Sequence, residues 1–233
     1  MNPRVSVVIP ALNEAASIGA VLAELPRPPV VDVVVVDGGS SDLTRSIAEG
    51  CGARVFVERR RGYGRACITG VEHARPEADI VVFLDADYSD RPAELIELID
   101  PIASDRADMV IGSRLAGRLH PGALPWHSRA GNRFAAWLMR KLYPVRLTDL
   151  GPFRAVRADL LRGMQLREQT YGWAVEMIAR GARAGWRIVE VPVSYHPRIG
   201  QSKITGTMRG SIGAAWFIVT RIFLYRFGSL SEG

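Results

Sequence analysis

Short apolar runs recur along the first half of the chain, each rich in β-branched residues and bounded by Pro, Gly or Asp. Such runs are typical of parallel strands that are buried on both faces of a sheet. We therefore expect five strands, at Val5–Ile9, Val30–Val36, Ala53–Val57, Asp79–Leu84 and Asp108–Gly112.

Segments with helical spacing separate these runs. They cover Glu14–Leu25, Asp42–Glu49, Gly64–His73 and Pro92–Ile99. Strands and helices that alternate in this way predict a doubly wound α/β fold, with a mostly parallel sheet and helices on both faces. Ligands bind such sheets beyond the carboxyl ends of the strands, and we look for functional residues there.

The second half of the chain is less regular. We expect a loop at Leu115–Pro125, which contains Pro and Gly, and then a helix at Arg129–Leu142. A strand at Phe153–Val156, a helix at Trp173–Ala184 and a strand at Arg187–Val193 complete the predicted core.

The segment Ile212–Phe227 is apolar on nearly all sides, and Arg221 marks its polar side. A membrane-spanning helix needs about 20 apolar residues, and this segment is shorter. We expect either a helix at a membrane interface or a helix that packs on the domain or on a second subunit. The predicted organisation is thus a main domain at 1–210, with halves at 1–114 and 115–210, followed by an apolar helix and tail at 211–233.

The composition of the 233 residues is that of one large, folded domain. Hydrophobic residues make up 48% and charged residues 23%, which excludes a disordered chain and a polytopic membrane protein. The net charge is +6 and arises almost wholly from arginine, a side chain suited to phosphates and carboxylates. The arginines are scattered and form no stripe with aromatic residues, so we do not expect a nucleic-acid partner. Because the N-terminus enters a strand-like run at once, we expect a cytoplasmic protein.

The motif LDADYSD follows the apolar run at Asp79–Leu84. In an extended segment, Asp85 and Asp87 point to the same side and can hold one hard cation. Mg²⁺ or Mn²⁺ at this position would neutralise a nucleotide diphosphate. The alternative is an Asp-rich turn before a helix, since Asp90 precedes Arg91-Pro92 and fits an N-cap.

Two further motifs follow the first two strands. In VVDGGSSD, Asp37 lies at the crevice, Gly38 and Gly39 allow the backbone to approach a ligand, and Asp42 can cap the next helix. In PALNE, Asn13 is a second candidate cap and Glu14 lies near the crevice.

In this order, the three motifs resemble those of the inverting glycosyltransferases of family 2, which have the GT-A fold. Further matching segments are RGYGRACITG, IGSR, GPFRAVR, YGWAVEM, EVPVSY and RIGQSK. The set looks most similar to the polyprenyl-phosphate glycosyltransferases, the dolichol-phosphate-mannose synthase group. This resemblance implies transfer of a hexose from a UDP- or GDP-linked sugar to a polyprenyl phosphate, by a peripheral enzyme on the inner face of the cell membrane, with a homodimer as one arrangement.

The resemblance also implies roles for individual residues. Asp37 would contact the nucleoside, Asp85 and Asp87 the metal and the diphosphate, and Arg114 a phosphate. The residues expected to bind the nucleotide sugar are Pro10, Asn13, Glu14, Asp37, Gly39, Ser40, Asp85, Ala86, Arg154, Ser202 and Lys203. Gly38 stands where the family often has a second Asp, so the base is not implied.

The candidate catalytic residues are Asp87, Arg114, Asp149 and Glu176. A phosphate acceptor is already anionic and needs cationic side chains, which Arg114 would supply together with Arg129, Arg133 or Lys203. The alternative acceptor is the hydroxyl of a soluble molecule or a saccharide. That reaction needs a carboxylate as base, and Asp149 and Glu176 are the candidates.

Overall fold

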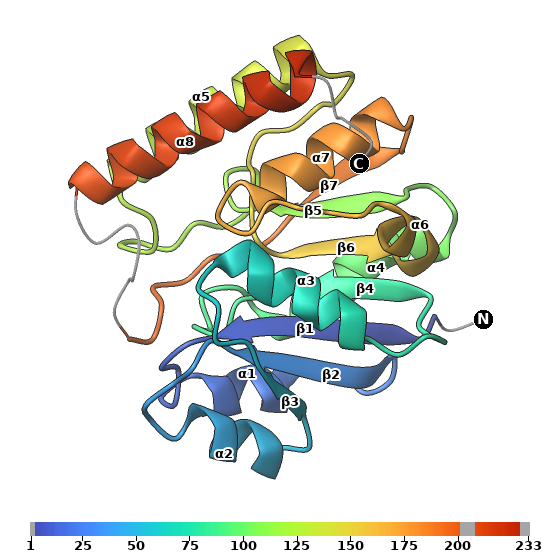
Figure 1. The fold of residues 1–233 in the computed structure, drawn as a ribbon, viewed down its shortest axis with the longest axis vertical. Helices are drawn as coiled ribbons and strands as arrows, with labels where there is room; N and C mark the ends of the chain where they lie inside the picture. The colour runs from blue at the N-terminus through green and yellow to red at the C-terminus, as the bar shows by residue number, and fades with distance from the viewer. Residues whose placement is uncertain (1–2, 201–207, 229–233) are drawn as a thin grey trace.

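The structure, a computed structural model, describes residues 3–200 and 208–228, which fold around a seven-stranded sheet (Figure 1). The strands lie in the order β3-β2-β1-β4-β6-β5-β7. Their bounds are β1 Val5–Ala11, β2 Val30–Asp37, β3 Arg54–Val57, β4 Ile80–Phe83, β5 Met109–Ser113, β6 Arg154–Arg157 and β7 Ile188–Pro192. All pairings are parallel except those of β6, which is antiparallel to both of its neighbours.

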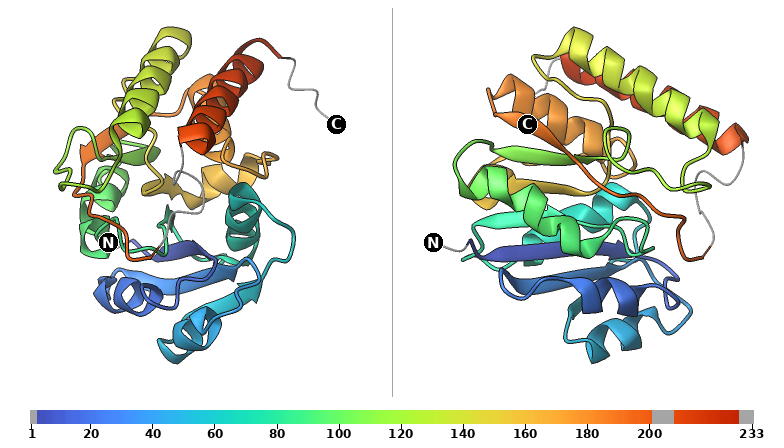
Figure 2. Two further views of the ribbon diagram at one scale, coloured as in Figure 1. Left: turned by 90° about the vertical axis from the view of Figure 1, so that its left-hand side faces the viewer. Right: turned by 180° about the vertical axis from the view of Figure 1, so that it is seen from behind.

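Helices cover both faces of the sheet. Their bounds are α1 Ile18–Glu24, α2 Thr44–Gly50, α3 Tyr63–His73, η1 Pro92–Glu94, α4 Leu95–Ala103, α5 Trp126–Leu142, α6 Ala158–Gly163, α7 Trp173–Arg183 and α8 Met208–Phe227. Helices α1, α2 and α4 pack on one face, and α3 and α7 lie on the other. Helices α5 and α8 lie side by side farther from the sheet, on the same side as α7 (Figures 1 and 2). The predicted α/β architecture is confirmed.

The alternation of side chains along the central strand explains the two apolar layers. Val5, Val7 and Ile9 of β1 pack into the layer under α1 and α4, whereas Val8 packs into the layer under α3. All four side chains are fully buried. A parallel strand that is covered on both faces needs such a continuous apolar run, and the sequence pattern predicted it for this reason.

Some predicted boundaries are wrong. Helix α1 begins at Ile18 rather than at Glu14, because the preceding residues form a turn in which the Ser17 N–H donates to the Glu14 carbonyl at 3.0 Å. Helix α5 begins at Trp126, three residues before the predicted start, and the short helix α6 was not predicted.

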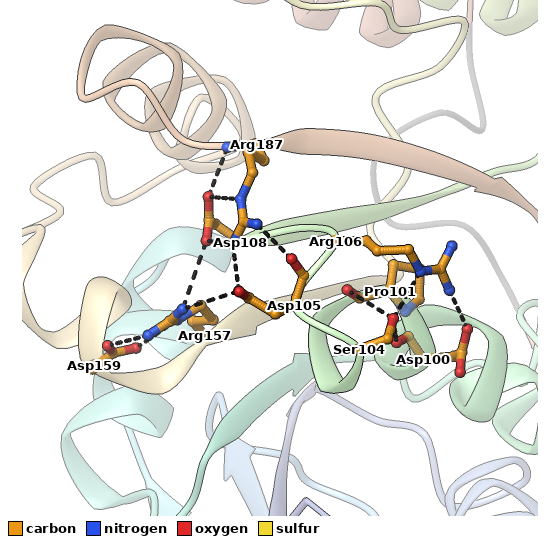
Figure 3. A network of polar contacts seen from close by, with 9 residues as sticks. All are labelled: Asp100, Pro101, Ser104, Asp105, Arg106, Asp108, Arg157, Asp159 and Arg187. Atoms are coloured by element: carbon orange, nitrogen blue, oxygen red, sulfur yellow. Dashed lines mark hydrogen bonds and ion pairs between the residues drawn. The ribbon is translucent and has the colours of Figure 1, made fainter.

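Ion pairs join three strands at the edge of the sheet opposite the predicted site (Figure 3). Asp108 precedes β5, and its Oδ1 lies 2.8 Å from Arg187 Nη2, next to the start of β7. The Arg187 side chain holds the pKa of Asp108 below its ordinary value. At the end of β6, the Arg157 N–H donates to the Asp108 carbonyl at 3.0 Å. These contacts fix the ends of β5, β6 and β7 relative to one another.

Because β6 runs antiparallel, its first residue lies at the carboxyl edge of the other strands. Arg154 pairs with Phe83 of β4 on one side and with Ile111 of β5 on the other. The reversed strand therefore delivers an arginine to the edge where ligands bind in this class of fold.

One side of α8 packs on the domain. Ile222 and Tyr225 are buried, and Arg221 Nε lies 2.8 Å from Glu168 Oε2. Trp216 and Phe223 are exposed on the same helix. We expected a docked or an interfacial helix, and the structure shows the docked contacts. Within residues 3–200 and 208–228, no helix combines the length and the apolar character needed to cross a bilayer.

Candidate active site

Two acidic residues follow β4 at the carboxyl edge of the sheet. Asp87 is buried, and its Oδ1 accepts hydrogen bonds from Ser89 N at 3.0 Å and Ser89 Oγ at 2.6 Å. Its Oδ2 lies 3.1 Å from Arg198 Nη1. Asp85 is half-buried, and its Oδ1 accepts a hydrogen bond from the Tyr63 hydroxyl at 3.0 Å.

The two carboxylates repel each other. Burial raises the pKa of Asp85 to about 6, with a further contribution from the negative charge of Asp87. Like charges that share a partly desolvated site are stabilised when a cation binds between them. The acidic pair is therefore chemically suited to a divalent cation.

Asp90 does not cap a helix, so that prediction is wrong. The N-cap of η1 is Arg91, and both carboxylate oxygens of Asp90 are buried without a hydrogen-bond partner among the described residues. Burial, followed by the charge of Asp85, raises the pKa of Asp90 well above its ordinary value. A third acidic group therefore lies buried beside Asp85 and Asp87.

The donor set fits a hard cation that is shared with a ligand. In the part of the chain that the structure describes, no three His, Cys, Asp or Glu side chains are grouped to hold one ion. Mg²⁺ is commonly bound by one or two carboxylates, with substrate phosphates and water completing its coordination. Asp85 and Asp87 provide such a pair.

The loops after β1 and β2 are tied together. Asn13 Oδ1 accepts a hydrogen bond from Ser41 N at 2.9 Å, and Asn13 N donates to Ser40 Oγ at 2.8 Å. Asn13 therefore links two loops and does not cap α1. The N-cap of α2 is Leu43 rather than the predicted Asp42, although Asp42 Oδ1 accepts a hydrogen bond from Thr44 N at 3.0 Å, next to the start of the helix.

The carboxylate of Asp37 is occupied by its own loop. It accepts hydrogen bonds from Gly39 N at 3.1 Å and from Ser40 N at 3.0 Å. Gly39 has a φ of 87°, a conformation that favours glycine. The contacts shape the loop at the crevice, and the predicted contact of Asp37 with a nucleoside stays a prediction.

The remaining predicted donor-site residues have varied surroundings. Pro10 lies in β1 and is half-buried, and Ala86 is buried between the two acidic residues. Glu14 N donates to Thr44 Oγ1 at 2.8 Å. Ser202 and Lys203 lie outside the described residues.

A cavity of about 250 Å³ opens beside Asp85. It lies between the carboxyl edge of the sheet and helices α5, α7 and α8. Polar lining residues include Tyr63, Asp85, Arg114, His127, Ser128, Asn132 and Arg154. Apolar lining residues include Leu124, Ala135, Leu150, Trp173 and Ile218.

Several buried polar atoms belong to the cavity residues. Within the described residues, no hydrogen-bond partner is found for Arg154 Nε, Trp173 Nε1, His127 Nε2 or Ser128 Oγ. The Arg154 guanidinium donates to the carbonyls of Ala174, at 3.2 Å, and Gly151. Burial lowers the pKa of Arg154, but an arginine stays protonated at neutral pH. Because buried polar groups normally have a hydrogen-bond partner, these atoms are candidates for contact with a ligand in the cavity.

Comparison with known proteins agrees with this geometry. The family model for glycosyl transferase family 2 matches residues 6–164. An uncharacterized glycosyltransferase of Mycobacterium tuberculosis is 40% identical over 211 residues, which cover 89% of this chain and 93% of that protein. The undecaprenyl-phosphate mannosyltransferase of Micrococcus luteus is 36% identical, with coverage of 94% of this chain and 93% of the relative. The chain belongs to glycosyl transferase family 2.

The fold of this glycosyltransferase also matches solved structures. One is glucosyl-3-phosphoglycerate synthase from Mycobacterium tuberculosis, crystallised with Mn²⁺, UDP and glucosyl-3-phosphoglycerate. The TM-score is 0.76 at 23% sequence identity, and the match covers 96% of this chain and 80% of the other. The predicted GT-A fold is confirmed.

Asp149, a candidate base of the glycosyltransferase, is paired with an arginine. Arg114 Nε and Nη2 donate to its two oxygens at 2.7 and 2.9 Å. Burial opposes ionisation of Asp149, but the charge of Arg114 and the hydrogen bonds from Arg114 and Leu150 together outweigh burial and lower the pKa of Asp149. A carboxylate held in this way is a poor proton acceptor. Arg114 itself lines the cavity.

Glu176, the other candidate base, is buried in α7 away from the lining of the cavity. It accepts hydrogen bonds from Glu168 N at 2.7 Å and Arg167 N at 3.0 Å, and it lies 2.9 Å from Arg180 Nε. These contacts give Glu176 a structural role, so its assignment as a base is not supported.

The basic residues that line the cavity differ from those predicted for the cationic pocket. Arg129 and Arg133 are exposed on α5 and do not line the cavity, whereas Arg154 does. Sequence reasoning assigned no role to Tyr63 or His127. Tyr63 lies inside the motif RGYGRACITG, between two glycines, and this position is the feature of the sequence that could have indicated a role for it.

We predict that Asp90→Asn flattens the pH dependence of stability. Native Asp90, with its raised pKa, keeps a proton that the unfolded chain releases as pH rises above about 4. The wild-type free energy of unfolding should therefore fall, relative to the variant, by up to about 1.4 kcal/mol per pH unit between the two pKa values. Chemical denaturation of both proteins in chelator at several pH values measures this difference. If the free energies of unfolding of the two proteins changed in parallel with pH, Asp90 would titrate as an ordinary carboxyl group.

Proposed function

We propose that this glycosyltransferase moves a hexose from a nucleotide diphosphate sugar to a polyprenyl phosphate, with inversion, with Mg²⁺ or Mn²⁺, and at the cytoplasmic face of the membrane. One observation carries the proposal: the cavity places Asp85, the Arg154 guanidinium and an apolar wall that includes Ile218 of α8 around one space. An acceptor with an anionic head and an apolar tail has this chemistry.

The donor half corresponds to residues 1–114. Asp85 and Asp87 would hold the divalent cation, which supplies charge neutralisation for the leaving diphosphate. Arg198, which is paired with Asp87, would add positive charge on the same side. The motif RIGQSK continues to Ser202 and Lys203, which remain predicted ligands. The fold relative crystallised with Mn²⁺ and UDP supports this assignment.

The acceptor half corresponds to residues 115–210. Arg154 and the neighbouring polar atoms of His127, Ser128 and Trp173 would hold the phosphate head. An ionised phosphate oxygen is itself the nucleophile and needs no base to remove a proton. It would attack the anomeric carbon from the face opposite the diphosphate. The name of the Micrococcus luteus relative supports a lipid phosphate as the acceptor.

The alternative acceptor, a hydroxyl group, is less well served by the site. It requires a carboxylate that can accept a proton at neutral pH. Asp149 is held by Arg114, and Glu176 is held by backbone N–H groups and Arg180. Because both candidate bases are already held by hydrogen bonds and ion pairs, the site favours the phosphate acceptor.

The outer helices present aromatic residues that suit a lipid surface. Trp126, Phe134 and Trp137 of α5 and Trp216 and Phe223 of α8 are exposed. Arg129, Arg133 and Arg140 are exposed on α5. Aromatic rings together with basic side chains are typical of helices that lie at the surface of an anionic membrane.

Product analysis tests the acceptor. The enzyme is incubated with UDP- and GDP-linked hexoses and, in parallel, with a polyprenyl phosphate in detergent, the corresponding polyprenol and soluble sugars. We expect mass spectrometry to find a glycosylated polyprenyl phosphate and no product with the polyprenol, because only the phosphate brings its own nucleophilic oxygen. Transfer to a soluble hydroxyl with none to the lipid phosphate would contradict the proposal.

A second prediction concerns the metal. Asp87→Ala should remove most turnover, because the loss of leaving-group stabilisation raises the barrier by several kcal/mol. Chelator should have the same effect on the wild type, and added Mn²⁺ should reverse it. Asp159→Ala, which removes an exposed acid at the opposite edge of the sheet, is the matched control. Full turnover of Asp87→Ala in excess chelator would end the metal proposal.

A third prediction concerns the membrane. Replacing both Trp216 and Phe223 with Ser should reduce sedimentation with anionic liposomes, because their exposed fractions are 70% and 43%. Turnover on a detergent-solubilised acceptor should change little. Deleting α8 would be a poorer test, since Ile222 and Tyr225 belong to the core. Unchanged sedimentation would remove α8 from the membrane contact.

A further inference from the structure

Tyr63 is held at the start of α3 by close contacts of the backbone. A Cβ atom on Gly62 would lie 2.1 Å from the Gln169 carbonyl oxygen, and one on Gly64 would lie 2.3 Å from that of Glu168. The Arg65 N–H donates to the Gln169 carbonyl at 3.0 Å. Glycine on both sides of Tyr63 lets the helix start press against residues 168–170. The position of the tyrosine is therefore set by the backbone on both sides of it.

The Tyr63 ring belongs to an aromatic cluster that includes the last residue of β4, the strand that precedes Asp85. Tyr63 meets Trp173 edge-on, with ring centroids 6.4 Å apart, and Trp173 meets Phe83 edge-on at 4.6 Å. Phe83 is the last residue of β4, two residues before Asp85. The hydroxyl and the carboxylate that it contacts are thus both attached to one packed unit.

The hydrogen bond between them has a fixed direction. A carboxylate oxygen can only accept, so the Tyr63 hydroxyl donates the hydrogen bond to Asp85 Oδ1, at 3.0 Å. Asp85 Oδ2 accepts no hydrogen bond from the residues that the structure describes. The Tyr63 hydroxyl therefore anchors one of the two oxygens of the Asp85 carboxylate.

We propose that Tyr63 is a positioning residue that holds the Asp85 carboxylate in the orientation in which it binds the divalent cation. The inference rests on the metal site proposed above. Hydrogen bonds from a second residue to a ligating carboxylate orient it, and their loss commonly weakens metal binding by roughly ten- to a hundredfold. Tyr63 acts through Asp85, so its effect is on the cation and not directly on the reacting atoms.

A role in packing or in acceptor contact gives different expectations. Tyr63 lines the cavity, and a lost acceptor contact would raise the KM for the acceptor. A lost packing contact would lower stability and kcat at every metal concentration. A positioning role raises the Mn²⁺ concentration needed for half-maximal rate, and kcat at saturating Mn²⁺ is retained.

The test is Tyr63→Phe, which keeps the ring and removes only the hydroxyl. Binding of Mn²⁺ alone is measured by electron paramagnetic resonance for the wild type, Tyr63→Phe and Asp85→Asn, and folding is verified by thermal unfolding. We expect roughly ten- to a hundredfold weaker Mn²⁺ binding by Tyr63→Phe, and an equal rise in the Mn²⁺ requirement for turnover.

Tyr143→Phe is the matched control, because Tyr143, at the end of α5, is likewise a tyrosine whose hydroxyl donates a hydrogen bond, to the Ile222 carbonyl of α8 at 3.0 Å. It should bind Mn²⁺ as the wild type does. Wild-type affinity in Tyr63→Phe, with binding lost in Asp85→Asn, would overturn the role of Tyr63 and leave the metal site standing. Equal Mn²⁺ binding by the wild type and Asp85→Asn would instead overturn the metal site itself.

Discussion

The crowding of negative charge after β4 is the constraint on which the arrangement of the candidate active site depends. Asp85, Asp87 and Asp90 lie within six residues, and two of them are buried. Carboxylates that have lost water and share a small volume cannot all ionise without compensation. The fold supplies compensation from distant segments: Arg114 follows β5, Arg154 begins β6 and Arg198 follows β7. The edge of the sheet thus collects positive charge from three strands around the acidic turn of a fourth.

Much of the fold follows from the local pattern. Apolar runs such as Val30–Val36 predict buried strands because a sheet covered on both faces requires them, and β2 is observed at Val30–Asp37. The direction of β6 could not be predicted in the same way. A four-residue strand shows the same alternation whether it runs with or against its neighbours, and only its pairing with β4 and β5 decides the direction.

Predictions at the site failed where distant contacts prevail over local rules. Asp90 before Arg91-Pro92 has the spacing of a helix cap, but tertiary packing buries its carboxylate. The residues around Asp149 in the sequence give no sign of its partner, yet it pairs with Arg114, which lies 35 positions away in the chain. In contrast, the position of Asp85 and Asp87 after a buried strand was enough to place them near each other at the carboxyl edge, although Asp87 lies in a turn and not in the extended segment that was expected.

The reversed strand β6 has a consequence for how the chain can vary. Neighbouring residues in a strand point to opposite faces, so a slip of one residue in the pairing of β6 would exchange the faces of Arg154 and Ala155. The positive charge beside the cavity would then be lost without any change in composition. The ion pairs of Asp108 with Arg157 and Arg187, at the far edge of the sheet, oppose such a slip. Residues at the end of the sheet remote from the cavity therefore preserve the alignment of the arginine, and substitutions there would alter ligand binding at a distance.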